Sequence, residues 1–164
     1  MSIKSSGIFK LCVLAAGKGT RNKSINGLHK ALYPIENQAV ISHIINCVSD
    51  DTEIVIAIGY KSEQVKTYIK HIFPNRNIKF VAIDNYDRPG SGPGLSLLKC
   101  KKYLQSPFIF TSTDTILEAP GIFERLDENW MGVSHVELEQ SSNYCLVYDH
   151  ENKKGDKYLK KLYF

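Results

Sequence analysis

Six apolar residues in a row, LCVLAA, stand near the amino end of the chain and stop at a Gly-Lys-Gly triplet. Such a run is too short to cross a membrane and is typical of a buried β-strand. After it, Gly17 and Gly19 let backbone N–H groups approach a phosphate closely, which a side chain at Cβ would obstruct. Lys18, Arg21 and Lys30 add positive charge around this loop. The stretch therefore predicts a polyphosphate site at the end of a strand.

Two common phosphate-binding loops do not fit this stretch. The dinucleotide-binding fingerprint needs a third glycine where this chain has Asn22, and no ribose-binding acid follows the next predicted strand, which ends at Gly59 and Tyr60. The P-loop needs Ser or Thr directly after Gly-Lys, whereas Lys18 is followed by Gly19. The sequence therefore disfavours both loops. Without the dinucleotide-binding fingerprint, it also disfavours a dinucleotide-dependent oxidoreductase.

The first loop closely resembles the opening signature of the nucleotidyltransferases that make nucleotide sugars and CDP-alcohols. In that family a strand ends in LAAGxGTR and a lysine follows about ten residues later. The residues that carry the match are Leu14, Ala15, Ala16, Gly17, Gly19, Thr20, Arg21 and Lys30. The resemblance implies that Arg21 binds the triphosphate bidentately and that Lys30 acts there as a mobile point charge. From the residues alone, an ordinary strand-to-helix turn and a surface lysine are the alternative.

A second glycine-rich loop, DNYDRPGSGPG, follows another predicted strand. Clusters of proline and glycine by themselves indicate only a turn. In the resembling family, however, the loop at this place meets the nucleotide base through an amide side chain and a small Gly-Ser or Gly-Thr pair. The resemblance implies nucleotide contacts from Asn85, Tyr86, Gly90, Ser91 and Gly92.

The segment FIFTSTD ends a further predicted strand with Asp114. A carboxylate there is costly inside a core but useful at a cleft. In the resembling family an aspartate at this place, usually after glycine, binds Mg²⁺; here Thr113 precedes it. Mg²⁺ prefers oxygen ligands and commonly combines one or two carboxylates with substrate phosphates. The resemblance implies Mg²⁺ at Asp114, whereas the residue alone also fits a cap of the following turn.

Strand and helix patterns alternate through most of the chain. The predicted strands are 11–16, 53–59, 78–83 and 108–112, with three more at 130–137, 143–148 and 157–164. The predicted helices are 38–50, one that Ser62 caps and that ends before Pro74, 95–104, and a short one at 120–129. This order predicts an α/β fold: a Rossmann-like, mainly parallel sheet with helices on both faces and a strand-rich C-terminal end. Three loops would then meet at one edge of the sheet.

The composition is that of a soluble globular protein, with 43% hydrophobic residues, 23% charged residues and a net charge of +4. A length of 164 residues suits one nucleotidyltransferase-like domain, 1–164. Lysine clusters at 99–102 and 153–161 contain or neighbour acidic and apolar positions, so they predict solvated faces and no nucleic-acid partner. The amino end lacks a hydrophobic signal core, which predicts a cytoplasmic location without a membrane partner.

Histidine and cysteine are expected to have no catalytic role. His29 stands where the resembling family usually has proline, and no second ligand has metal spacing, so a solvated side chain is expected. The cysteines lie far apart among apolar neighbours, which predicts reduced core residues and neither a zinc site nor a redox pair. They are Cys12, Cys47, Cys100 and Cys145.

The resemblance as a whole implies an Mg²⁺-dependent enzyme that transfers a nucleoside monophosphate from a nucleoside triphosphate, with CTP or UTP favoured, and releases pyrophosphate. The implied acceptor is a sugar phosphate, a small phospho-alcohol or a phosphonate, used for surface polysaccharide or lipid precursors. Members usually continue past a strand such as KKLYF into an acceptor-binding half with a second metal ligand, so we expect part of that half to lie outside these residues. A homo-oligomer or an additional domain is left open, and the alternative function is a non-catalytic nucleotide-binding or regulatory module.

Overall fold

A computed structural model of the chain describes residues 9–19, 27–116, 129, 131–132, 146–151 and 157–163. The chain forms two compact units, Met1–Asp127 and Glu128–Phe164. Both predicted nucleotide loops and Asp114 belong to the first unit. The prediction of one domain over 1–164 stays a prediction.

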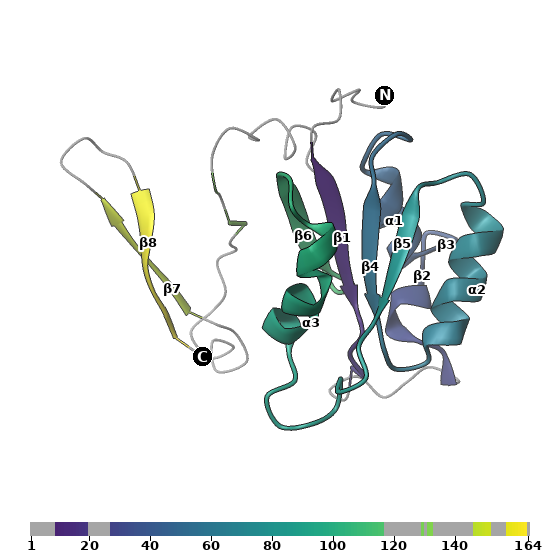
Figure 1. Ribbon diagram of the computed structural model, residues 1–164, viewed down its shortest axis with the longest axis horizontal. Coiled ribbons are helices and arrows are strands. Elements are labelled where there is room, and N and C mark those ends of the chain that lie inside the picture. Colours follow the sequence, from purple (N-terminus) through teal and green to yellow (C-terminus); the bar gives the residue numbers. More distant parts are fainter. Residues whose placement is uncertain are drawn as a thin grey trace. The chain divides into compact units, whose positions relative to one another are not determined.

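A four-stranded parallel sheet forms the centre of the first unit (Figure 1). Its order is β5-β4-β1-β6, and the strands are Lys10–Ala15 (β1), Ile54–Ile58 (β4), Ile78–Ala82 (β5) and Phe108–Ser112 (β6). Every neighbouring pair is parallel, and Leu11 lies opposite both Ile54 and Ile109. The central strands β1 and β4 are almost wholly buried, which explains their continuous apolar sequences. The predicted α/β class is confirmed.

Helices cover both faces of the sheet, as predicted (Figure 1). They are α1 (Val40–Asn46), α2 (Ser62–Ile72) and α3 (Pro93–Cys100). Because side chains alternate along a strand, Leu11 and Val13 of β1 join the buried cluster formed with α1 and α2. Cys12 and Leu14 point to the other face and pack with Cys100 of α3. The two predicted nucleotide loops thus start from a sheet that has helices on both faces.

A short β-hairpin precedes α1 where the sequence predicted the start of a helix. Its strands are β2 (Pro34–Ile35) and β3 (Gln38–Ala39), which pair antiparallel. Between them Glu36 and Asn37 have φ angles of 46° and 64°, the conformation that a two-residue turn of the I′ kind needs. The predicted helix start was therefore wrong by two residues, because the first two belong to this ladder and the helix begins at Val40.

The N-terminus of α2 also differs from the prediction. Its N-cap is Lys61, in a left-handed conformation with φ 47° and without a side-chain capping bond, so Ser62 does not cap the helix. The reason is the turn before it: the N–H of Ser62 donates to the carbonyl of Gly59 at 3.2 Å, which places Ser62 inside the first helical turn. The predicted end is confirmed, with Phe73 as the C-cap residue. Ile72, near the end of the helix, is 47% exposed.

The thiols of the first unit occupy core or partly buried positions. Cys12 and Cys100 are buried, Cys47 is partly buried, and all three are free. A hydrogen bond with Cys100 and burial raise the pKa of the Cys12 thiol well above its usual range. Cys12 and Cys100 thus occupy the core as predicted, the reduced state stays a prediction, and Cys145 lies outside the described residues.

The remaining predictions concern the later part of the chain. A 3-10 turn, η3 (Lys101–Tyr103), continues α3. In the second unit, β7 (Leu146–Glu151) and β8 (Lys157–Tyr163) form an antiparallel hairpin, which confirms the last two predicted strands in kind. The helix predicted at 120–129 and the strand predicted at 130–137 fall almost entirely outside the described residues. Within the part of the chain that is described, no helix has the length and apolar character to cross a membrane.

Candidate functional site

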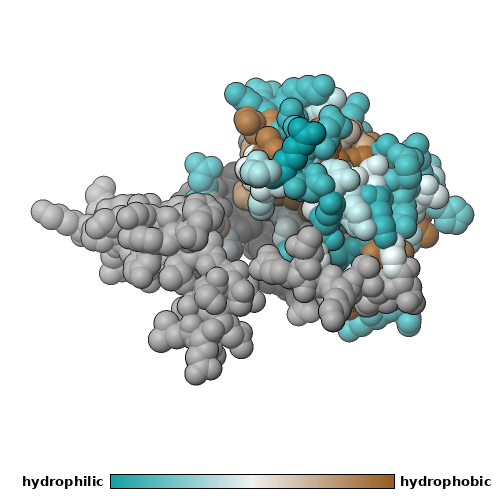
Figure 2. Space-filling view, turned by 90° about the horizontal axis from the view of Figure 1, so that it is seen from below, coloured by the Kyte–Doolittle hydropathy of each residue, from teal (hydrophilic) through white to brown (hydrophobic). Residues whose placement is uncertain are grey.

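A cavity of about 250 Å³ lies at the carboxyl ends of β1, β5 and β6. Segments that are far apart in sequence form its walls, so the three loops converge as the topology predicted. Figure 2 views the molecule from this side, where the coloured surface is mostly hydrophilic. The predicted residues that line the cavity are Leu14, Ala16, Gly17, Lys30, Tyr86, Ser91, Gly92 and Asp114.

The first glycine-rich loop turns directly beside this cavity. Gly19 has a φ of 66°, a left-handed conformation that glycine adopts without strain, and a Cβ there would lie 3.1 Å from Cδ of Lys30. Gly17 needs no such conformation, and a Cβ there would meet no atom within 4 Å. The space beside Gly17 is therefore open, and a ligand could approach its backbone.

The other predicted residues of the first loop fall into three groups. Leu14 and Ala16 line the cavity, so their surfaces would meet a bound nucleotide. Ala15 is fully buried as the last residue of β1, from which the loop starts. Thr20 and Arg21 lie outside the described residues.

Two oppositely charged side chains face each other in the cavity. Lys30 begins a 3-10 turn, η2 (Lys30–Leu32), and its Nζ lies 3.7 Å from Oδ2 of Asp114, just beyond the end of β6. The Lys30 side chain is 25% exposed and that of Asp114 62%, so water screens the pair and it adds little to stability. The hydroxyl of Ser112 donates to the Asp114 carboxylate. An ammonium group, which can bind phosphate oxygens, thus lies beside a carboxylate, which can bind a cation.

Asp114 is the one acidic side chain among the described residues that line the cavity. Among the described residues, no group of three His, Cys, Asp or Glu side chains could hold an ion by itself. Asp114 is a single, largely exposed carboxylate at the cavity wall. Mg²⁺ often takes only one or two protein carboxylates and fills its shell with phosphate oxygens and water. The site therefore fits Mg²⁺ that arrives with a polyphosphate.

The second loop contributes an aromatic wall. Tyr86 lines the cavity, and its ring packs directly on Gly59, where an added Cβ would lie only 2.7 Å from Cδ1 of the ring. The ring centroid of Tyr60 lies 6.3 Å from that of Tyr86. Asn85 is exposed and does not line the cavity. Of the two residues predicted to meet the base, the structure brings Tyr86 into the cavity.

The glycine-serine part of the second loop forms a tight turn. The N–H of Ser91 donates to the carbonyl of Arg88 at 2.8 Å, and Gly90 between them has a φ of 81°. Ser91 and Gly92 line the cavity, whereas Gly90 does not. Gly90 therefore shapes the turn that presents the other two.

An ion pair that sequence reasoning missed joins the two loops. Nζ of Lys18 lies 2.7 Å from Oδ2 of Asp87 and 5.8 Å from the ring centre of Tyr86. The hydrogen bond with Asp87 raises the pKa of Lys18, and the same bond lowers the pKa of Asp87. Both side chains are about 40% exposed, so salt should screen the pair. No local pattern reveals it, because the partners are 69 residues apart.

His29 corrects a sequence expectation. The predicted solvated side chain is fully buried, and its Nδ1 accepts the N–H of Ala31 at 3.1 Å. Burial, followed by the charges of Lys30 and Lys61, lowers the pKa of His29 to about 4, so the ring is neutral near pH 7. A polar sequence predicts an exposed loop, but the backbone of this one is hydrogen-bonded to Gln64 of α2. With Nδ1 accepting, Nε2 carries the proton.

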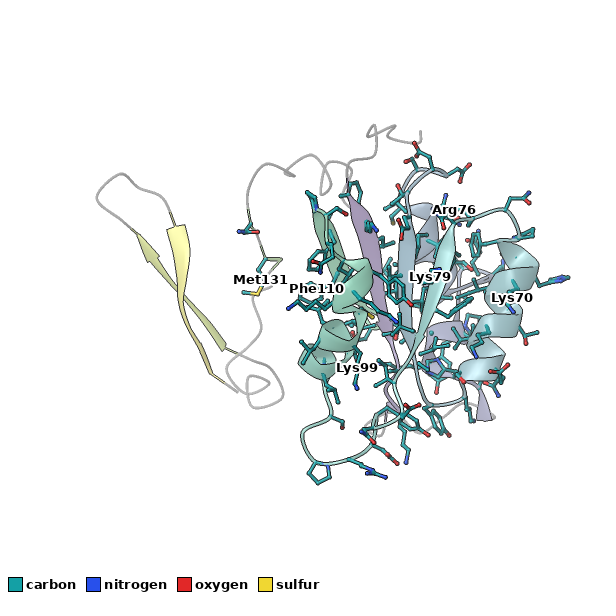
Figure 3. The ribbon with its side chains drawn as sticks, viewed as in Figure 1. Lys70, Arg76, Lys79, Lys99, Phe110 and Met131 are labelled. Carbon is teal, nitrogen blue, oxygen red and sulfur yellow. The ribbon has the colours of Figure 1, made fainter. Side chains whose placement is uncertain are left out.

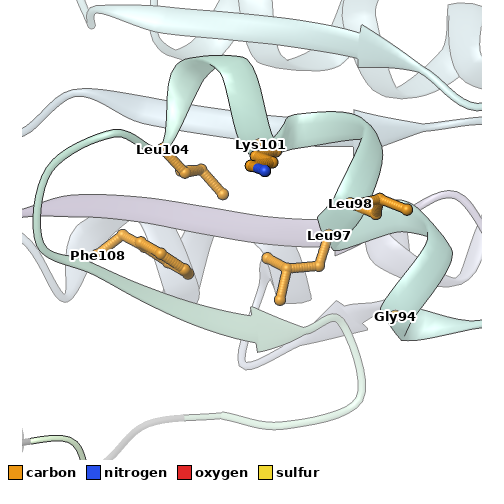
Figure 4. A pocket seen from close by; sticks show the side chains of 6 residues that line it. All are labelled: Gly94, Leu97, Leu98, Lys101, Leu104 and Phe108. Atoms are coloured by element: carbon orange, nitrogen blue, oxygen red, sulfur yellow. The ribbon is translucent and has the colours of Figure 1, made fainter.

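A second, apolar groove is not the candidate site. It has about 280 Å³ and lies between α3 and β6, where Leu97, Leu98, Leu104 and Phe108 line it (Figure 4). Its one charged lining side chain is Lys101. On the same edge strand Phe110 is 52% exposed (Figure 3). Nothing in its lining resembles a phosphate or metal site.

The chain is similar to one protein family and to proteins of known activity. The family model of the MobA-like NTP transferase domain matches residues 11–156. The bifunctional protein GlmU of Methanocaldococcus jannaschii is 29% identical over 143 residues, which cover 85% of this chain and 33% of that protein. The D-glycero-alpha-D-manno-heptose 1-phosphate guanylyltransferase of Campylobacter jejuni is 23% identical over 138 residues, which cover 82% of this chain and 61% of that protein. The chain thus spans a third of the length of the first relative and under two thirds of the second.

A solved structure shares the fold. The crystal structure of UDP-glucose pyrophosphorylase complexed with UDP-glucose superimposes with a TM-score of 0.66 over 94% of this chain and 68% of that chain. The sequences are 17% identical, so this likeness concerns the fold.

Proposed function

The chain belongs to the family of MobA-like NTP transferase domains, and from this membership we propose that it transfers a nucleoside monophosphate from a nucleoside triphosphate to a phosphorylated acceptor, with release of pyrophosphate. A sugar phosphate or a small phospho-alcohol is the acceptor class, and CTP or UTP the donor. The name of the heptose 1-phosphate relative supports a sugar phosphate. The proposed setting is the cytoplasm, and the proposed products serve surface polysaccharide or lipid synthesis.

The observation that carries the proposal is the composition of one cavity. It combines the open backbone at Gly17, the ammonium of Lys30, the aromatic ring of Tyr86 and the carboxylate of Asp114. The phosphates of a nucleoside triphosphate could bind to the backbone at Gly17 and to Lys30, and its flat base could lie against the Tyr86 ring. A cation bound to the phosphates could be held by the Asp114 carboxylate. Each group of the cavity therefore has a counterpart on the nucleotide.

The reaction needs positioning and charge more than covalent chemistry by the protein. An oxygen of the acceptor phosphate attacks the α-phosphorus, a P–O bond forms, the bond to the bridging oxygen breaks and pyrophosphate leaves. Lys30, and Arg21 by the family signature, would hold the phosphate oxygens as their negative charge grows. Asp114 would hold Mg²⁺ together with those oxygens, and the ion supplies charge neutralisation at the transferred group.

The direct test is pyrophosphate release from a panel of CTP, UTP, GTP and ATP with sugar 1-phosphates and phospho-alcohols in the presence of Mg²⁺. Lys30→Ala, Arg21→Ala and Asp114→Ala should each lower turnover by about 100-fold, the usual effect of losing one such group. Lys70→Ala is the matched control, because Lys70 is an exposed lysine on α2 (Figure 3). Its turnover should equal that of the unchanged chain.

Two results would contradict the proposal. Binding of a nucleoside triphosphate without pyrophosphate release from any acceptor, also in the complete gene product, would identify a non-catalytic nucleotide-binding module. Equal turnover in Lys30→Ala and Lys70→Ala would show that the cavity is not the reaction site.

A further inference from the structure

The backbone just before Lys30 is held by the first turn of α2. The side-chain amide of Gln64 makes two hydrogen bonds: its Oε1 accepts the N–H of His29 at 3.0 Å, and its Nε2 donates to the carbonyl of Gly27 at 3.3 Å. Nζ of Lys61 donates to the same carbonyl. One amide thus joins both ends of the segment 27–29, whose backbone groups would otherwise face water.

His29 holds the same backbone from the other side. Its φ of −67° and ψ of 138° are extended, and its Nδ1 accepts the N–H of Ala31, which caps the 3-10 turn that begins at Lys30. The carbonyls of Ala15 and Gly17 face the ring and favour its protonated form, although Nε2 makes no hydrogen bond of ordinary geometry within the described residues. The ring therefore lies between the first loop and the backbone of Lys30.

These contacts determine where the ammonium of Lys30 can reach. The backbone of Lys30 is fixed from both sides, its side chain passes close to Gly19, and its Nζ ends 3.7 Å from Asp114. We propose that Gln64 and His29 are positioning residues that hold Lys30 in the geometry in which it binds phosphate. The proposal rests on the proposed nucleotidyl transfer only for the identity of the bound anion.

A merely structural role would hold the loop without affecting Lys30. Gln64 offers a clean test, because it is exposed and Gln64→Ala should fold. Gln105→Ala is the matched control: its exposed amide also donates to a backbone carbonyl, that of Lys101 at 2.7 Å, and neither residue lines the cleft with Asp114.

The first measurement needs no nucleotide. Competitive acetylation of the whole chain, followed by mass spectrometry, reports the reactivity of each lysine. Gln64→Ala should raise the reactivity of Lys30, because its side chain leaves the partly buried, ion-paired position, while Gln105→Ala should leave it unchanged. Unchanged Lys30 reactivity in Gln64→Ala would overturn the proposal.

The second measurement is a double-mutant cycle on the affinity for CTP and UTP with Mg²⁺. Gln64→Ala should weaken binding about fivefold, the factor of one net hydrogen bond, when Lys30 is present, and should have no effect when Lys30 is already alanine. An equal effect in both backgrounds would show that Gln64 acts without Lys30. If neither nucleotide binds but Lys30 reactivity still rises, the positioning role stands and the proposed function fails.

His29 is tested by rescue. His29→Ala and His29→Asn both remove the ring, but the Asn carbonyl oxygen can still accept the N–H of Ala31. The asparagine variant should recover nucleotide affinity and low Lys30 reactivity relative to the alanine variant, at comparable free energies of unfolding. Equal Lys30 reactivity in the two variants would remove His29 from the proposal.

Discussion

Among the described glycines, Gly59 has the least room for a side chain. It directly follows β4, and the next residue is Tyr60, whose N–H donates to the carbonyl of Ala16 at 3.0 Å. A Cβ at Gly59 would lie 2.7 Å from the ring of Tyr86 and 2.8 Å from the carbonyl oxygen of Ala16. Both distances are shorter than any ordinary contact of a Cβ atom. The ring could rotate away, but the carbonyl belongs to the backbone directly after β1.

We therefore expect Gly59→Ala to destabilise the chain by about 1–3 kcal/mol, the usual cost of overpacking a filled site. The matched control is Gly94→Ala in α3, where an added Cβ would meet no atom within 4 Å. Because alanine favours helices over glycine, that variant should be more stable by up to about 1 kcal/mol. Urea unfolding followed by circular dichroism measures both changes.

The same substitution should also change the cavity. Displacing the ring of Tyr86 removes part of the wall against which we place the base, so Gly59→Ala should weaken binding of CTP or UTP while Gly94→Ala should not. The reasoning is refuted if Gly59→Ala is as stable as the unchanged chain. That result would show that the ring of Tyr86 and the carbonyl of Ala16 can move aside for a Cβ atom without cost.

Three further predictions follow from charges in the same region. Burial lowers the pKa of His29 from 6.5 to about 4, so between these pH values the unfolded chain binds a proton at His29 that the folded chain does not. The free energy of unfolding should therefore fall by about 3 kcal/mol as the pH falls through this window. Urea unfolding at pH 7.5 and 4.5 should show this loss in the unchanged chain, and the contribution of His29 to it should be absent in His29→Asn. Asp87→Asn frees Lys18 for phosphate, so this variant should bind the nucleotide more tightly than the unchanged chain at low salt and equally tightly at 1 M salt. Equal affinity of the two proteins at low salt would show that the ion pair does not compete with the ligand. Removing divalent cations with EDTA should abolish pyrophosphate release by the unchanged chain, and turnover that survives EDTA would exclude the proposed role of Mg²⁺.

The sequence predicted most of the central sheet and the general place of the site. Continuous apolar runs identified β1 and β4 to within about one residue, since a strand buried on both faces needs little beyond hydrophobic side chains. The predicted bounds of β6 also match the observed ones, although this strand is partly exposed. Parallel topology then required the loops after β1, β5 and β6 to meet at one edge. Gly17 and Asp114 were therefore expected in one cleft, and both line it.

Other features could not be read from local patterns. Glu36 and Asn37 form a turn that glycine usually makes, so the hairpin before α1 left no signal. Ser62 is a common capping residue, but the left-handed Lys61 moved the helix start past it. His29 lies in a polar stretch, yet it is fully buried and its N–H donates to Gln64 of α2.

The sequence by itself determined the class of fold, the strand-end position of both loops and the kinds of charge around them, because strand formation and chain topology depend on residue types that are neighbours along the chain. Only the tertiary structure decided which side chains meet: Tyr86 on Gly59, Lys18 with Asp87, and Gln64 around the backbone before Lys30. Each of these contacts joins residues that are tens of positions apart. Their geometry depends on how the loops pack once the sheet has formed, and no local pattern carries that information.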